Sequence, residues 1–202
     1  MHELIREVRA LAQTGLHYTK DPFDRERFER LIAIGNQMVA ALGGVDEKAV
    51  ERFFVPEKGY ATPKVDLRAC VVRDGEVLLV KEKSDGRWTL PGGWADQNEA
   101  PSAGVVREVN EESGLHIAVE SLYAVKDRDR HPYEPKYPVS IYKLFFTASV
   151  VGGEPRPDME IAEVGFFAPD ALPPLSLARV LPEDITAGYA HYTAGSRGTT
   201  CD

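Results

Sequence analysis

The sequence predicts an α+β fold in which a helical module, residues 1–58, precedes a domain of strands and helices, residues 64–192. Apolar residues recur every three to four positions through roughly the first 55 residues, which is typical of amphipathic helices. Beyond them, β-branched and aromatic residues gather in short runs separated by turn residues, which is typical of strands. The final segment, residues 193–202, is polar, and we expect it to be flexible.

The N-terminal module is expected to contain two main helices. The first should end near Gly15, and the second should begin at Asp21–Pro22 and end at Gly43, followed by a short third helix from Asp46 to Phe54. Two amphipathic helices joined by a short loop cannot bury both apolar stripes well by themselves. The stripes comprise Leu4, Ile5, Val8, Leu11 and Ala12 in the first helix, and Phe28, Leu31, Ile32, Ile34, Met38, Val39 and Leu42 in the second.

The second domain begins with strand signals after a linker at residues 56–63. Asp74–Gly75, placed between two β-rich runs, predicts a hairpin. A proline-interrupted helical region is expected at residues 171–185. The predicted strands lie at residues 65–72, 76–83, 116–127, 139–150 and 163–168.

Composition and net charge limit the classes of function that this chain can have. The net charge of −8 gives no indication of tight binding to long nucleic acid. It does not exclude an anionic phosphate substrate, because bound metal ions can reverse the local charge. No apolar run approaches membrane-spanning length and there is no signal-peptide pattern, so we expect a cytoplasmic protein without a membrane partner. Cys70, in an apolar run, and Cys201, in the polar tail, imply neither a disulfide framework nor a metal cluster.

A glutamate-rich helix follows the turn Pro91–Gly92–Gly93, with Asn98 expected as N-cap and Gly114 as the C-terminal stop. At about 100° per residue, three carboxylates project from one face near its C-terminal end, where the helix dipole disfavours negative charge. A hard divalent cation with oxygen ligands would offset this repulsion. The alternative is a solvated charged face. The three carboxylates are Glu108, Glu111 and Glu112.

The spacing decides in favour of the metal site. Gly93, Glu99 and the run Arg107-Glu108-Val109-x-Glu111-Glu112-x-Gly114-Leu115 resemble the Nudix hydrolase signature at every specified position. Over nearly the whole chain, the order of motifs resembles a bacterial subgroup with a helical N-terminal extension, which includes CDP-choline and ADP-ribose-type pyrophosphatases. The resemblance implies a Nudix α/β/α sandwich with a mixed β-sheet.

The resemblance also implies a chemistry. Nudix enzymes hydrolyse a nucleoside diphosphate linked to another moiety and release a nucleoside monophosphate. Mg²⁺, with Mn²⁺ as a possible substitute, would be held by Glu108, Glu111, Glu112 and the carbonyl of Gly92. Arg107 and Glu99 would orient these carboxylates, which makes Arg107 and Glu111 part of the catalytic set. Hydrolysis of RNA ends or house-cleaning of nucleotides is the alternative activity, and a non-catalytic nucleotide sensor is a third reading.

The general base and the substrate contacts follow less directly from the pattern. In the subgroup a glutamate from a late loop commonly reaches the metals, and Glu160 fits this role, with Glu163 as its rival. Either could instead be a solvated loop carboxylate. The candidate substrate-binding residues are Arg68, Lys126, Arg128, His131 and Trp94, and each of the cations could instead lie on the surface without a ligand.

The wide apolar arc of the second N-terminal helix also suggests assembly. A single contact face needs a stripe of roughly 100°, and a wider arc left exposed would form a large apolar patch. The subgroup that the chain resembles forms dimers through this module. We therefore expect a homodimer through the N-terminal helices, with folding of these helices onto their own domain as the alternative.

Overall fold

The computed structural model describes residues 2–43, 50, 59–137 and 139–202. The chain forms two compact units. The first comprises Met1–Pro63 with Lys136–Ser140, and the second comprises Lys64–Pro135 with Ile141–Asp202. The chain thus divides after Pro63, and the short segment Lys136–Ser140 belongs to the first unit.

Helices α1 (His2–Tyr18) and α2 (Pro22–Gly43) make up most of the first unit. Asp21 caps α2 as predicted, because its Oδ1 accepts hydrogen bonds from the backbone N–H groups of Phe23 and Asp24 at 2.8 and 2.9 Å. The predicted end of the first helix at Gly15 is wrong. A Cβ at Gly15 would clash with the Phe28 ring, so the glycine allows close packing of α2 rather than ending α1. The predicted third helix lies outside the described residues, apart from Val50.

The apolar residues of the two helices divide between two faces. Ile5, Ala12 and Val39 are buried, and the buried Arg9 donates from Nε to Asn36 Oδ1 at 2.8 Å, which joins the helices. A second face remains exposed on each helix. It comprises Leu4, Val8 and Leu11 on α1, and Leu31, Ile34, Met38 and Leu42 on α2.

The second unit is built on one mixed sheet of seven strands among the described residues. The strand order is β3-β2-β1-β5-β4-β7, with β6 paired to β2; β1–β5 and β4–β7 are parallel and the other pairs antiparallel. The hairpin between β1 and β2 turns at Asp74 and Gly75, both with positive φ, as predicted. The strands are β1 (Lys64–Arg73), β2 (Glu76–Glu82), β3 (Trp88–Thr89), β4 (Leu115–Asp127), β5 (Ile141–Gly153), β6 (Ile161–Phe167) and β7 (Thr200–Cys201).

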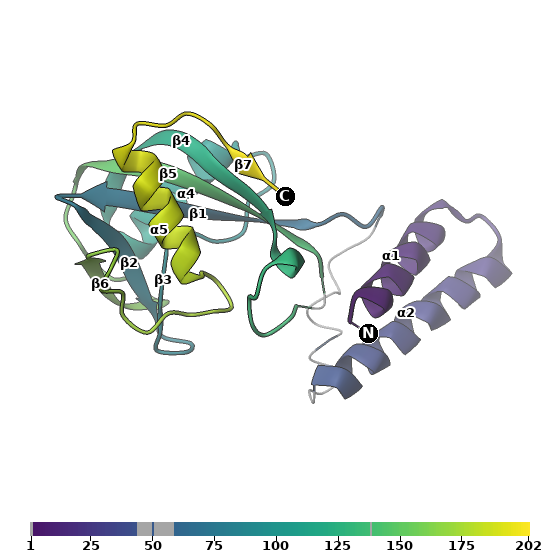
Figure 1. The fold of residues 1–202 in the computed structure, drawn as a ribbon. Coiled ribbons are helices and arrows are strands. Elements are labelled where there is room, and N and C mark those ends of the chain that lie inside the picture. The colour runs from purple at the N-terminus through teal and green to yellow at the C-terminus, as the bar shows by residue number, and fades with distance from the viewer. Residues whose placement is uncertain (1, 44–49, 51–58, 138) are drawn as a thin grey trace. The chain divides into compact units, whose positions relative to one another are not determined.

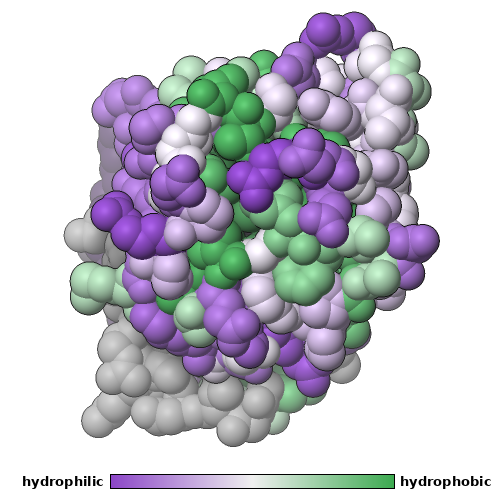
Figure 2. All heavy atoms as spheres, turned by 90° about the vertical axis from the view of Figure 1, so that its left-hand side faces the viewer, coloured by the Kyte–Doolittle hydropathy of each residue, from purple (hydrophilic) through white to green (hydrophobic). Residues whose placement is uncertain are grey.

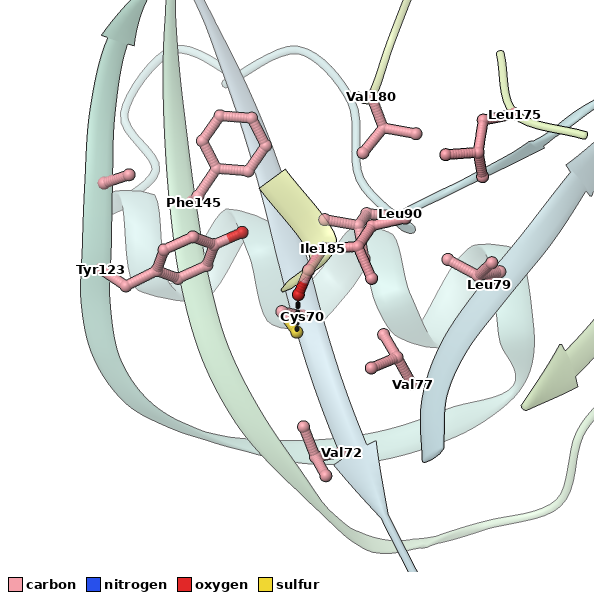
Figure 3. Close-up of a cluster of buried hydrophobic side chains, with 11 residues drawn as sticks. Cys70, Val72, Val77, Leu79, Leu90, Tyr123, Phe145, Leu175, Val180 and Ile185 are labelled. Carbon is pink, nitrogen blue, oxygen red and sulfur yellow. Dashed lines mark hydrogen bonds between the residues drawn. The ribbon is translucent and has the colours of Figure 1, made fainter. Parts of the chain in front are cut away.

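Two helices sandwich this sheet, α4 (Pro101–Ser113) behind it and α5 (Pro182–Thr193) in front of it (Figure 1). Alternate residues of β1 serve the two faces. Leu67, Ala69 and Val71 pack in the core under α4, and Cys70 packs on the other face beside Ile185 of α5 (Figure 3). The predicted α+β sandwich with a mixed sheet is confirmed.

Helix boundaries differ from the sequence prediction in two places. Helix α4 has Ala100 as its N-cap, and Asn98 instead has a positive φ of 63° in the preceding loop. The helix ends at Gly114 as predicted, with φ 72°. The helical region expected at residues 171–185 is largely irregular, and α5 begins only at Pro182, which occupies its first turn.

The tail that we expected to be flexible contributes an edge strand. Strand β7 pairs with β4, and Thr199 Oγ1 donates to the carbonyl of Leu122 at 2.7 Å. Arg197 and Thr200 donate to the carbonyls of Glu120 and Tyr123. The open backbone groups of an edge strand account for this addition, which composition alone does not reveal.

The surface of the sheet edge that carries β2 and β6 mixes charged and apolar side chains. Viewed from that side, purple polar residues surround green apolar ones (Figure 2). In the part of the chain that is described, no helix is long and apolar enough to cross a membrane.

Candidate active site

The turn Pro91–Gly93 lies directly against β1. The carbonyls of Pro91 and Gly93 accept hydrogen bonds from Ala69 N and Leu67 N at 3.0 and 2.8 Å. Gly92 has φ 138°, and a Cβ at this position would clash with the Leu67 carbonyl. Only glycine permits this approach of the two backbones. The Gly92 carbonyl takes part in neither of these two hydrogen bonds with β1.

Glu112 of α4 reaches this turn. Its Oε2 accepts a hydrogen bond from Gly92 N at 2.8 Å. Burial raises the pKa of Glu112 to about 8, and the lowering effects of Arg68 and the Gly92 N–H do not offset it. A carboxylate in this position would gain from a nearby cation.

Glu108 flanks the same turn one helical turn earlier. A Cβ on Gly93 would lie 2.9 Å from Glu108 Oε2, so the absence of a side chain at Gly93 leaves room for this carboxylate. Burial also raises the pKa of Glu108, although Arg107 acts in the opposite direction. Glu112 therefore contacts Gly92, and Glu108 lies close to Gly93.

Arg107 connects the remaining carboxylates. Its Nε and Nη2 form a bidentate pair with Glu99 at 3.0 Å each. Its Nη1 lies 3.0 Å from Glu108 Oε1 and 2.9 Å from Glu111 Oε2, which includes the expected i,i+4 pair. Asp96, which the sequence analysis overlooked, is a further partner at 3.4 Å.

These residues fit a hard divalent cation by their chemistry. The glutamates offer only oxygen ligands. Burial raises the pKa values of Glu108 and Glu112 because it disfavours their charged forms, and a bound cation would stabilise those forms. As placed, however, they are paired with Arg107 and Gly92. Among the described residues, no three His, Cys, Asp or Glu side chains converge as a ready ligand set.

The two candidate bases lie near the start of β6. Glu160 directly precedes the strand, and Glu163 lies within it. Glu163 forms an ion pair with Lys81 at 2.7 Å. Glu160 is exposed at the residue before β6, and its carbonyl accepts from Lys83 N at 2.9 Å. Within the described parts of the chain, its carboxylate has no hydrogen bond or ion pair. Glu160 therefore keeps a free carboxylate, whereas Glu163 is engaged on the sheet.

Arg68 is buried, and its contacts differ from those expected of a substrate ligand. Its Nη2 and Nε bind Asp66 Oδ1 at 2.9 and 3.1 Å, and its Nη1 donates to the Leu90 carbonyl at 3.0 Å. Lys143 of β5 pairs with the other oxygen of Asp66. Asp66 and Lys143 are not among the residues predicted from the sequence. Asp66 and Arg68 lie two positions apart, on the same face of an otherwise apolar strand. This pair of opposite charges is the sequence signal that could have identified Asp66.

The other candidate substrate cations also have partners in the fold. Lys126 pairs at 2.6 Å with Asp184, a buried residue of α5 that Tyr133 also contacts. Arg128, at the start of the 3-10 helix Arg128–Arg130, is buried and donates to the carbonyls of Pro135 and Ala178. These contacts indicate that Lys126 and Arg128 position the β4–β5 loop.

His131 and Trp94 are more accessible. His131 Nε2 lies 3.0 Å from Asp202 of the tail. Trp94 directly follows the glycine pair, forms a bridge with Asp66, and remains 45% exposed. Of the five predicted substrate-binding residues, Trp94 combines a position directly after the glycine pair with an exposed side chain, whereas Arg68 is buried.

Comparisons with known proteins identify the family. One family model, described as a UDP-X-like N-terminal oligomerisation domain, matches residues 1–54, and the NUDIX domain model matches residues 63–187. The chain belongs to the Nudix hydrolase family. A Bacillus subtilis Nudix relative, provisionally named an ADP-ribose pyrophosphatase, is 39% identical over 184 residues, which cover 91% of this chain and 88% of that protein.

Solved structures extend the likeness to both units. A crystal structure of a UDP-X diphosphatase is 33% identical with a TM-score of 0.64, and the match covers 99% of this chain and 97% of that one. An ADP-ribose pyrophosphatase from Streptococcus suis is 35% identical with a TM-score of 0.63, covering 70% of this chain and all of that one. This Nudix protein is a pyrophosphohydrolase, and hydrolases of the family generally use divalent metal ions.

Proposed function

We propose that this Nudix enzyme cleaves the diphosphate of a nucleoside diphosphate linked to another moiety, of the ADP-ribose or CDP-choline type, and releases a nucleoside monophosphate. The observation that carries the proposal is the placement of Glu108 and Glu112 at the Gly92–Gly93 turn, together with Glu111, which Arg107 binds along with Glu108. The names of the relatives, ADP-ribose pyrophosphatase and UDP-X diphosphatase, support a small nucleotide diphosphate as substrate.

Glu108, Glu111, Glu112 and the Gly92 carbonyl would hold Mg²⁺, with Mn²⁺ as a substitute. When bound, the metal supplies charge neutralisation at the anionic diphosphate. Arg107 orients Glu99, Glu108 and Glu111 through its three nitrogens, and the Gly92 N–H orients Glu112. These hydrogen bonds and ion pairs thus keep several carboxylate oxygens close together despite their mutual repulsion.

Glu160 is proposed as the general base. Its exposed carboxylate would accept a proton from water as the water oxygen attacks phosphorus and the bridging P–O bond breaks. Trp94, half exposed beside the glycine pair, is proposed to contact the substrate. Glu163 is less suited to the base role because Lys81 holds it.

We also propose a homodimer formed through the N-terminal unit. Both helices keep an exposed apolar face after packing on each other, and the family model for residues 1–54 describes an oligomerisation domain. A second copy of the chain would bury these faces.

Product analysis tests the proposed activity. The full chain, incubated with Mg²⁺ and ADP-ribose, CDP-choline or a UDP-sugar, should release AMP, CMP or UMP from at least one of them. Consumption of triphosphorylated RNA ends or nucleoside triphosphates alone would favour the house-cleaning alternative. Binding of a nucleotide without hydrolysis would indicate a sensing role.

A further inference from the structure

Arg68 joins two parts of the second unit that are far apart in the sequence. Its guanidinium binds Asp66 on its own strand through Nε and Nη2, and through Nη1 it reaches the Leu90 carbonyl at 3.0 Å. Arg68 is 6% exposed, so these bonds are shielded from water. Burial alone would lower the pKa of Arg68, but Asp66 outweighs this effect and raises it, so the group stays charged.

Asp66 is itself held from the neighbouring strand. Lys143 of β5 lies directly beside it in the parallel register and pairs with its Oδ2. Burial would raise the pKa of Asp66, yet Arg68 and Lys143 lower it. The position of the Arg68 fork is therefore fixed by two adjacent strands rather than by one flexible partner.

The carbonyl that Arg68 holds directly precedes the glycine turn. Leu90 is followed by Pro91, Gly92 and Gly93, which pack on the β1 backbone at Leu67 and Ala69. The Gly92 N–H then donates to Glu112 at 2.8 Å. A continuous series of contacts thus leads from β5 through β1 and the turn to the carboxylate.

The charges of these groups favour the same connection. Asp66 faces two basic side chains, Arg68 and Lys143, and burial lowers the pKa of Lys143 to about 8. Beyond Asp66, the carboxylates that raise the pKa of Arg68 are those of Glu112 and Glu82. Glu82 has its own cation, Arg179, at 2.9 Å. Arg68 in turn lowers the pKa of Glu112, so the two charges attract each other.

From these contacts we propose that Arg68 is a positioning residue for the carboxylate site: anchored by Asp66 and Lys143, it holds the Leu90–Gly93 turn on β1 and thereby orients Glu112. It acts through the turn and not by touching substrate. The consequence for metal affinity rests on the proposed function, whereas the consequence for the turn does not.

The hold on the turn is tested by amide hydrogen exchange of the metal-free full chain, measured by NMR. Arg68→Lys keeps the charge but loses the fork, because one ammonium cannot bond both Asp66 and Leu90 in the same geometry. We expect exchange of the Gly92 amide to accelerate at least tenfold, with the Val71 amide of β1 nearly unchanged. Arg73→Lys, at the exposed end of the same strand, is the matched control and should alter neither amide.

The consequence for the site is tested by titrating Mn²⁺ into the same proteins without substrate. Arg68→Lys should weaken Mn²⁺ binding at least fivefold, and Arg73→Lys should not. Arg68→Gln serves as a second variant if Arg68→Lys does not fold, because it leaves Asp66 and Lys143 as a balanced pair. Glu112→Gln shows whether the measured Mn²⁺ binds at these carboxylates.

Several results would overturn the inference. An unchanged Gly92 amide would do so, as would equal acceleration throughout β1, which would indicate a general contribution to sheet stability. A raised KM with both readouts unchanged would make Arg68 a substrate contact instead. If Glu112→Gln bound Mn²⁺ as well as the natural chain does, the proposed metal site would fail, while Gly92 exchange would still decide the role of Arg68.

Discussion

At the scale of single residues, the glutamates on α4 are placed in two different environments. Glu112 is partly buried and accepts a hydrogen bond from a backbone N–H, whereas the side chain of Glu111 is 54% exposed and pairs with Arg107. A buried carboxylate loses more when its charge is not balanced. Glu112 should therefore depend more strongly on a bound cation than Glu111 does.

Replacement of the proposed metal ligands tests their role. Glu111→Gln and Glu112→Gln should each lower kcat by roughly 100-fold or more, because each removes one anionic ligand while keeping the side-chain shape. Steady-state kinetics with Mg²⁺ measure this effect. Glu76→Gln, an exposed carboxylate at the β1–β2 hairpin, should leave kcat unchanged. Full activity of Glu112→Gln would refute the assignment.

The general base is tested by comparing two neighbouring glutamates. Glu160→Gln should depress kcat far more than Glu163→Gln, because only Glu160 has a carboxylate without a partner among the described residues. Metal affinity should change less than in the α4 variants. The opposite ranking of the two kcat values would transfer the role to Glu163.

The two cysteines should differ in reactivity and in their effect on stability. Burial raises the pKa of the Cys70 thiol to about 12, whereas Cys201 is exposed. The unfolded thiol loses its proton from about pH 8.5, while the folded one keeps it. The unfolded state therefore binds fewer protons above this pH. The contribution of Cys70 is fully present below about pH 8.5 and is lost as the pH rises toward 12.

Urea unfolding under reducing conditions checks this prediction. The difference in unfolding free energy between the natural chain and Cys70→Ala should shrink between pH 8 and pH 10.5. Cys201→Ala should show no such trend, since its thiol is exposed in both states. A constant difference for Cys70→Ala would contradict the assigned burial effect.

At the scale of elements, the C-terminal segment has a structural task. Strand β7 covers the outer edge of β4, and Asp202 reaches both the Asp127 N–H, at 2.7 Å, and His131, at 3.0 Å. The segment therefore secures the end of β4 and the loop that follows it. Neither contact can be deduced from the polar composition of the tail.

Deletion of residues 197–202 should loosen the end of β4. We expect deuterium uptake of peptides covering residues 122–131 to increase several-fold, because the backbone groups that β7 covers become exposed to water. Peptides from β1 should be unaffected. A deletion variant with unchanged uptake in residues 122–131 would show that the pairing contributes little in solution.

At the scale of the whole molecule, the exposed apolar faces of α1 and α2 should decide the oligomeric state. Leu31→Glu combined with Met38→Glu should convert the homodimer to a monomer, because a second copy could bury these charges only at a large cost. Light scattering on the full chain measures the change. Gln37→Glu, exposed on the same helix outside this face, is the control. A natural chain that is monomeric would contradict the assembly itself.

The sequence by itself determined the fold class, the main strands and the arrangement of carboxylates on α4. These features depend on local spacing: helical periodicity places Glu108, Glu111 and Glu112 on one face, and Arg107 lies within reach of Glu111 four residues later. The Asp74–Gly75 hairpin and the Gly114 helix stop follow from the same kind of local preference.

Only the tertiary structure decided the partners of Arg68, Lys126 and the tail. Lys143 meets Asp66 across 77 residues of sequence, and Lys126 meets Asp184 across 58. Such contacts depend on strand pairing and helix packing, which no local pattern specifies. Gly15 illustrates the same limit. It leaves room for the Phe28 ring of the neighbouring helix and does not end its own helix. A close approach between two segments leaves no periodic signal in the sequence.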